Sequence, residues 1–182
     1  MSFEVSPFNT HYVALDGMLY TYDKTVFVAC PAGKAGSASI AQGTKGIAAN
    51  AFNHSQLASI SIPESVTDIY EYAFSDSVKL ERIMIPESVV MIGNGAFAGC
   101  SKLKTADFYG KPPAAFGNNV FENTSSGFVI RYLEWNKSYW SPTGANNYKG
   151  YPIEPFAVLR LNEKSAYTIE TKYSRIGGIS EN

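Results

Sequence analysis

The amino-acid sequence predicts an α/β solenoid, a right-handed stack of about four short coils with a parallel β-sheet along one face. The main observation is self-similarity, because residues 57–79 and 80–102 align without a gap. Both segments read L-x-x-I-x-I-P-E-S-V-x-x-I-x-x-x-A-F. A unit this short cannot bury its apolar side chains alone, so neighbouring units must stack to build a continuous core.

Each unit contains the signals of one short strand and a return segment. Ile60 and Ile62 alternate with serine, which is typical of a strand with one buried face. Pro63 cannot donate a ladder hydrogen bond and therefore ends the strand. The pair Ala73-Phe74 returns along the far side, where alanine is small enough for the neighbouring backbone to approach.

Weaker copies flank the two strong ones. The upstream copy lies 22 residues earlier, with Ile40 at the place of Ile62 and Phe52 at the place of Phe74. The downstream copy begins at Leu103, and its Phe121 arrives one residue late. Repetition therefore predicts columns of like residues, including a column of stacked phenylalanines.

Both ends of such a stack need a cap, because an open section of the core would associate with other molecules. At the front, Asp16-Gly17 is a tight-turn signal, and residues 18–22 and 25–30 are predicted strands of a hairpin. At the back, residues 108–156 hold twelve aromatic residues. There we expect a strand at 128–132, a short helix or turn at 134–140 and a strand-like run at 148–156.

The sequence is thus expected to divide into four segments. Residues 157–182 alternate like a β-hairpin, and they are either extra strands on the cap or the start of another module. The four segments are an N-terminal hairpin cap, the repeats, an aromatic C-terminal cap and this tail: 1–36, 37–127, 128–156 and 157–182.

The repeat resembles the BspA-like leucine-rich-repeat family, whose units carry I-P-x-S-V-x-x-I and A-F-x-x-C. The resemblance covers roughly residues 40–121, with Ala41 where proline is expected and Ser55 and Ser77 where cysteine is usual. It implies a secreted or cell-surface protein of a bacterium or protist, with a role in adhesion or host interaction. A fold hosts many functions, so this implication is an analogy.

Composition excludes several other classes. Fifteen Lys and Arg against sixteen Asp and Glu give a net charge of −1, which argues against nucleic-acid binding. No apolar run reaches the roughly 20 residues of a membrane span. The first seven residues lack a basic region followed by an apolar one, so we expect no signal peptide in this sequence.

Residues that carry chemistry are few. His11 and His54 are the only histidines, and neither lies in a catalytic or metal-binding motif, so we expect no catalytic residue, metal or cofactor. Cys30 and Cys100 lie about three coils apart, or roughly 15 Å. A disulfide tolerates a Cα separation of about 7 Å at most, so two free thiols are predicted.

The outward face of the repeat sheet is the first candidate binding surface, for a protein or extracellular-matrix partner. Its exposed positions are expected to include Arg82, Met84, Thr105 and Asp107. A second hypothesis is glycan stacking on C-terminal aromatic rings, and a third is a spacer or targeting module beside an enzyme. The candidate glycan-stacking residues are Trp135, Tyr139 and Trp140.

Overall fold

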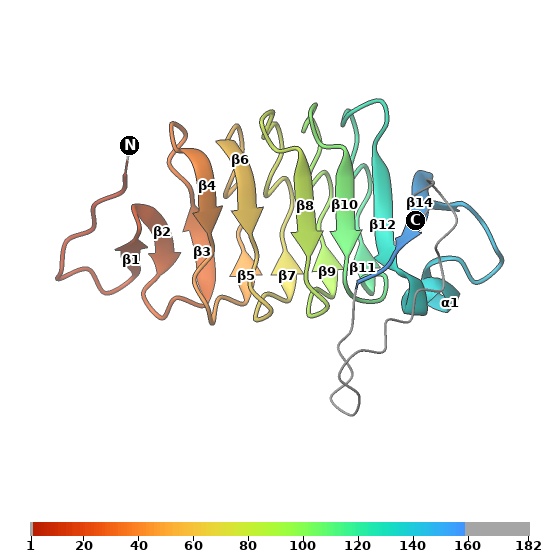
Figure 1. Ribbon diagram of the computed structural model, residues 1–182. Helices are drawn as coiled ribbons and strands as arrows, with labels where there is room; N and C mark the ends of the chain where they lie inside the picture. Colours follow the sequence, from red (N-terminus) through yellow and green to blue (C-terminus); the bar gives the residue numbers. More distant parts are fainter. Residues whose placement is uncertain (1, 159–182) are drawn as a thin grey trace, which may run out of the picture.

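A computed structural model describes residues 2–158 of the chain, which stack as successive coils of one elongated solenoid (Figure 1). Two runs of strands lie side by side along its long axis, and the strands of the repeats pair in parallel. One is a seven-stranded sheet in the order β1-β2-β3-β5-β7-β9-β11. Its strands are β1 (Tyr12–Leu15), β2 (Met18–Thr21), β3 (Val26–Ala29), β5 (Gly46–Ile47), β7 (Asp68–Ile69), β9 (Met91–Ile92) and β11 (Ala115–Phe116).

The second run consists of longer strands. A two-stranded sheet pairs β4 with β6, and a five-stranded sheet has the order β13-β14-β12-β10-β8. Because β6 lies beside β8, the two sheets form one continuous face (Figure 1). The strands are β4 (Ala35–Ser39), β6 (Gln56–Ser61), β8 (Arg82–Ile85), β10 (Thr105–Phe108), β12 (Val129–Leu133), β13 (Asn147–Tyr148) and β14 (Tyr151–Phe156).

The predicted strands of the two strong repeats are confirmed in β6 and β8. In β8, Ile83 and Ile85 are buried while Arg82 and Met84 are exposed, which is the alternation expected of a strand with one buried face. The strands β8, β10 and β12 pair in parallel, with Thr105 opposite Arg82 on one side and Val129 on the other. Each coil therefore places its residues in register with the next.

The core contains the predicted phenylalanine column. The rings of Phe52, Phe74, Phe97 and Phe121 stack nearly parallel, with centroid separations of 4.8, 4.8 and 5.3 Å. Phe27 extends the column, 4.4 Å from Phe52, although residues 25–30 were expected only to cap the repeats. Strand β3 both pairs antiparallel with β2 and pairs parallel with β5, so the first coil begins inside the predicted hairpin.

One turn position has positive φ in four successive coils. Asn50, Tyr72, Gly95 and Asn119 occupy it, with φ of 59°, 55°, 57° and 54°. Asparagine and glycine tolerate this left-handed region, whereas a bulky side chain is an outlier there. Tyr72 is thus the strained member of the column, and its ring lies against Gly95.

A column of small polar residues follows each phenylalanine. Ser77 Oγ donates to the carbonyl of Phe52 at 2.9 Å, and Cys100 Sγ donates to the carbonyl of Phe74 at 3.1 Å. Both cysteines are free, as predicted. Burial raises the pKa of Cys100 to about 12 and raises the pKa of the half-buried Cys30 as well.

The N-terminal cap contains one more strand than expected. Strand β1 pairs antiparallel with β2 across Asp16-Gly17, where both residues have positive φ. Met18 and Tyr20 are almost fully buried over the first coil, and the Tyr20 ring meets Phe27 edge-on at 5.1 Å. The hairpin therefore closes the core at this end.

The C-terminal cap is built around Trp140. Residues Glu134–Asn136 form a 3-10 turn, and α1 (Lys137–Trp140) follows, where a short helix or turn was expected. Trp140 is 1% exposed, and its Nε1 donates to the Gly110 carbonyl at 3.0 Å. The predicted strands at 128–132 and 148–156 correspond to β12 and β14. The hairpin predicted for 157–182 lies almost wholly outside the described residues.

Candidate interaction surface

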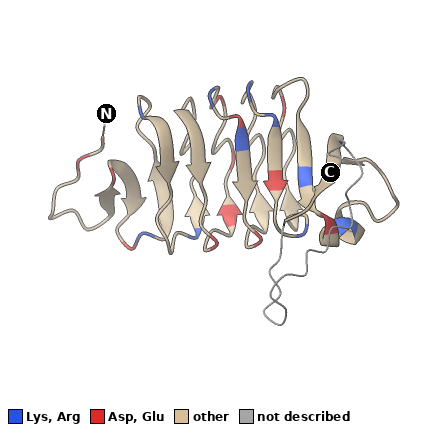
Figure 2. Ribbon diagram, viewed as in Figure 1, with Lys and Arg blue, Asp and Glu red and all other residues tan. Residues whose placement is uncertain are grey.

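The outward face of the longer strands changes character along the solenoid. Strands β4 and β6 carry no charged residue and present mainly serine and alanine. Charged positions on the strands of this face begin at β8 and continue on β10 and β12 (Figure 2). The C-terminal half of the face is therefore the chemically distinctive part.

Asp107 lies at the centre of this half. It was expected to be exposed, and that expectation is wrong, because its relative exposure is 0%. Arg82 Nε and Nη2 contact its Oδ2 from β8, while Arg131 approaches from β12. The strand alternation does point Asp107 outward, but two arginines on the adjacent strands fold over it.

Arg131 is the residue that sequence reasoning missed. Its Nε donates to Asp107 Oδ1 at 2.6 Å and its Nη2 donates to Oδ2 at 2.9 Å, a bidentate pairing. These hydrogen bonds to Asp107 raise the pKa of Arg131. Residues 128–132 were interpreted as part of a cap, although an arginine one coil beyond an aspartate is a signal available in the sequence.

Apolar and aromatic groups surround the ion-pair cluster. Met84 is 46% exposed, and its Sδ accepts a hydrogen bond from Tyr109 at 3.8 Å. Phe156 packs edge-on against Tyr109 at 5.5 Å and lies under the Arg131 guanidinium, 5.2 Å from Cζ to the ring centroid. Thr105, the fourth predicted binding residue, is half-buried. We call this set the arginine patch: Arg82, Met84, Thr105, Asp107, Tyr109, Arg131 and Phe156.

The three candidate glycan-stacking residues do not share one environment. Trp135 and Tyr139 are 44% and 51% exposed, and Lys111 Nζ lies 4.3 Å from the centre of the Tyr139 ring. Trp140 is buried against Phe108 and Tyr148, so it cannot stack on a ligand. Its assignment to a glycan site is wrong because this ring closes the end of the core.

The described part of the chain contains no cluster of metal-binding side chains. Between residues 2 and 158, no group of three or more His, Cys, Asp or Glu side chains could hold a metal ion. His54 lies at the surface with its Nδ1 4.0 Å from Asp76. Within the same residues no helix is both long enough and apolar enough to cross a membrane.

Solved structures of other proteins resemble this chain. A leucine-rich repeat protein from Eubacterium ventriosum is 28% identical with a TM-score of 0.61, over 72% of this chain and 35% of that protein. The pneumococcal vaccine antigen PcpA is 20% identical with a TM-score of 0.54, over 84% of this chain and 49% of that protein. This chain therefore spans only about a third and about half of the lengths of these two proteins.

No protein of curated function matches the chain. The model of the BspA type leucine rich repeat region, in contrast, matches residues 22–134 in six copies. The sequence predicted about four coils, so six copies exceed that expectation. The additional copies extend over residues that were predicted to belong to the caps. The chain belongs to the BspA-type leucine-rich-repeat family.

Proposed function

We propose that this chain is a non-catalytic recognition module of a secreted or cell-surface bacterial protein, and that it binds a protein partner through the arginine patch. The observation that carries the proposal is the Arg82–Asp107–Arg131 cluster in a sheet face whose other half is mainly serine and alanine. Repeat solenoids use such extended faces for binding.

The composition of the patch favours a protein partner. Arginine, tyrosine, phenylalanine and methionine are enriched at protein interfaces, and arginine and tyrosine are frequent among the residues that dominate binding energy. Asp107 holds both guanidinium groups in place before binding, so less side-chain entropy is lost when a partner docks. The Arg82 side chain remains 52% exposed and can contact a partner directly.

The test is a binding measurement on a panel of immobilised extracellular-matrix and host cell-surface proteins. The double variant Arg82→Ala with Met84→Ala should weaken binding at least about tenfold, because both side chains belong to the exposed part of the patch. Ser59→Ala on β6 is the matched control on the same face and should leave binding unchanged. Equal binding by the double variant and the wild type would refute the proposal.

A carbohydrate site at Trp135 and Tyr139 is the second candidate, favoured by the exposure of both rings. Binding of an oligosaccharide that is lost in Tyr139→Ala and kept in the arginine-patch variant would support it. The spacer hypothesis would gain support from an enzyme domain in the same gene.

A further inference from the structure

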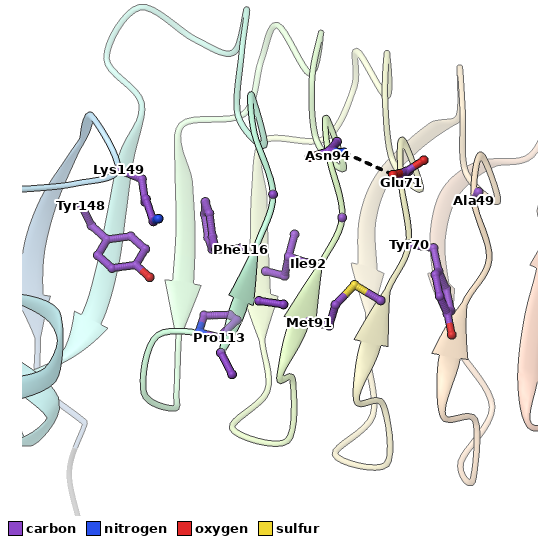
Figure 3. A pocket seen from close by; sticks show the side chains of 14 residues that line it. Ala49, Tyr70, Glu71, Met91, Ile92, Asn94, Pro113, Phe116, Tyr148 and Lys149 are labelled. Atoms are coloured by element: carbon purple, nitrogen blue, oxygen red, sulfur yellow. Dashed lines mark hydrogen bonds between the residues drawn. The ribbon is translucent and has the colours of Figure 1, made fainter.

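A groove crosses the coils on the side of the seven-stranded sheet, away from the arginine patch. Its volume is about 620 Å³, within the range of small-ligand sites. It extends from Ala49 across three coils to Tyr148 and Lys149 of the C-terminal cap (Figure 3). No predicted site residue lines it.

The groove lies where the residue that follows the strand is glycine in two successive coils. The residue after each strand of this sheet is Tyr70, then Gly93, then Gly117. A Cβ on Gly93 would lie 2.6 Å from the backbone nitrogen of Glu71, and one on Gly117 would lie 2.5 Å from that of Asn94. Close contact between coils therefore requires glycine at both positions, and the apolar side chains of Met91, Ile92, Pro113 and Phe116 line the groove around them (Figure 3).

Aromatic rings stand at both ends of the groove. Tyr70 is 43% exposed at one end. At the other end Tyr148 packs edge-on against Phe116, with centroids 5.4 Å apart, and against the buried Trp140. Because Tyr70 and Phe116 lie two coils apart, the two tyrosines are separated by roughly 15 Å.

Polar side chains line the groove between and beside the rings. Asn94 Nδ2 donates to Glu71 Oε1 at 3.2 Å, and the Asn118 backbone N–H donates to Asn94 Oδ1 at 2.8 Å. The amide is therefore held in place from both sides before any ligand arrives. Lys149 stands near Tyr148 at the opposite end from Glu71 (Figure 3).

The backbone N–H groups along the groove already donate hydrogen bonds within the solenoid. The N–H groups of Tyr70, Gly93 and Gly117 donate to Ile47, Ile69 and Ile92 of the preceding coils at 3.0, 2.8 and 2.8 Å. A peptide lying across the strands would leave its own main-chain groups without these partners. Sugar hydroxyls instead need side-chain carboxylates, amides and ammonium groups, and the apolar faces of pyranose rings need exposed aromatic rings.

We propose that this groove binds an oligosaccharide of about three pyranose units, because each unit is about as long as one coil step of roughly 4.8 Å. One outer unit stacks on the exposed Tyr70, and the other packs against the partly buried Tyr148. The Glu71–Asn94 pair and Lys149 bind the hydroxyls between them. The site is separate from the arginine patch and does not depend on protein binding there.

The experiment is an oligosaccharide array probed with the labelled chain, followed by titration calorimetry with each oligosaccharide that binds. Tyr70→Ala and, at the other end, Lys149→Asn should each weaken binding at least about tenfold. Asparagine suits the positive φ of 53° at position 149, so this variant keeps the turn. Tyr72→Asn removes an exposed tyrosine that does not line the groove and should bind like the wild type.

Three results would overturn the proposal. One is a wild-type chain that binds no oligosaccharide on the array. Another is binding that survives in Tyr70→Ala but disappears in Tyr139→Ala, which would place the sugar on the cap. The third is displacement of the bound sugar by unrelated extended peptides, which would assign the groove to peptides. The Arg82→Ala, Met84→Ala variant should keep full oligosaccharide binding, so failure of this proposal and failure of the proposed protein-binding function are distinguishable.

Discussion

The phenylalanine column and the outward sheet face of the same coils follow opposite rules. Inside, each coil repeats the residue of the coil before it, and the rings from Phe27 to Phe121 stack at 4.4–5.3 Å. Outside, equivalent positions on β8, β10 and β12 hold Met84, Asp107 and Arg131. Repetition is therefore required where coils pack, and variation is free to accumulate where solvent or a partner lies.

Among substitutions in these two regions, Phe74→Ala should lower the free energy of unfolding the most. Its ring stacks on both Phe52 and Phe97 and is fully buried, so the substitution opens a cavity between two coils. We expect a loss of about 3–5 kcal/mol in the free energy of unfolding, measured by urea denaturation. Val90→Ala is the matched control, because Val90 is 51% exposed. A loss below about 1 kcal/mol in Phe74→Ala would show that the column is not a continuous core.

Asp107→Asn should come second, because Asp107 points outward from its strand and is nevertheless fully buried. The amide cannot neutralise the two arginines held around it, and breaking a buried ion pair by removing one partner costs about 3–5 kcal/mol. Arg82→Ala should cost less than about 1 kcal/mol, since its side chain is half exposed and Arg131 still pairs with Asp107. Equal losses in the two variants would contradict the buried role of Asp107. Urea denaturation of both variants measures the difference.

The difference between the two regions also explains what the sequence could predict. The Phe52, Phe74, Phe97 and Phe121 column was predictable because stacking repeats the same contact at a fixed period. Burial of Asp107 was not, because alternation along a strand gives the direction of a side chain and says nothing about long neighbours that fold over it. Pairing an aspartate with arginines on both adjacent coils requires the register between strands.

The caps and the groove also depend on contacts between coils that the sequence pattern of a single coil does not predict. The sequence predicts the turn at Asp16-Gly17 but not strand β1, because β2 pairs on its other side with β3 and that pairing alone satisfies the hairpin pattern. The groove depends on Gly93 and Gly117, which the repeat alignment treats as ordinary variable positions. The two glycines form a candidate site only because the rings of Tyr70 and Tyr148 flank them, and that arrangement is visible only in the structure.

Tyr72→Asn should have a moderate effect in the opposite direction. Asn50 and Asn119 hold the same left-handed turn in other coils, so asparagine removes the backbone strain of a tyrosine at φ 55°. We expect the free energy of unfolding to rise by up to about 1 kcal/mol, reduced by the lost contact of the ring with Gly95. Thermal denaturation measures this change, and a lower midpoint would show that the ring contact outweighs the strain.

Cys100→Ser should have the smallest effect near neutral pH, because it copies the residue that the column already uses. Ser77 Oγ donates to the Phe52 carbonyl just as Cys100 Sγ donates to the Phe74 carbonyl, so the hydroxyl can keep the hydrogen bond. We expect a change within about 1 kcal/mol at pH 7. A larger loss would show that packing of the sulfur, rather than its hydrogen bond, sets this position.

Raising the pH above 9 should make the stability of the wild type differ from that of Cys100→Ser. Burial raises the pKa of Cys100 from 9.0 to about 12, so between these values the unfolded thiol loses its proton while the folded thiol keeps it. The unfolded state then binds fewer protons, and the stability that is fully present below pH 9 is lost as the pH rises toward 12. Relative to Cys100→Ser, the wild type should become less stable across this window in urea denaturation.

In the folded wild type, a thiol reagent at pH 8 should modify the half-buried Cys30 and reach Cys100 only on unfolding, because the thiolate is the reactive form. Equal labelling rates at the two cysteines would contradict the burial of Cys100 in the column.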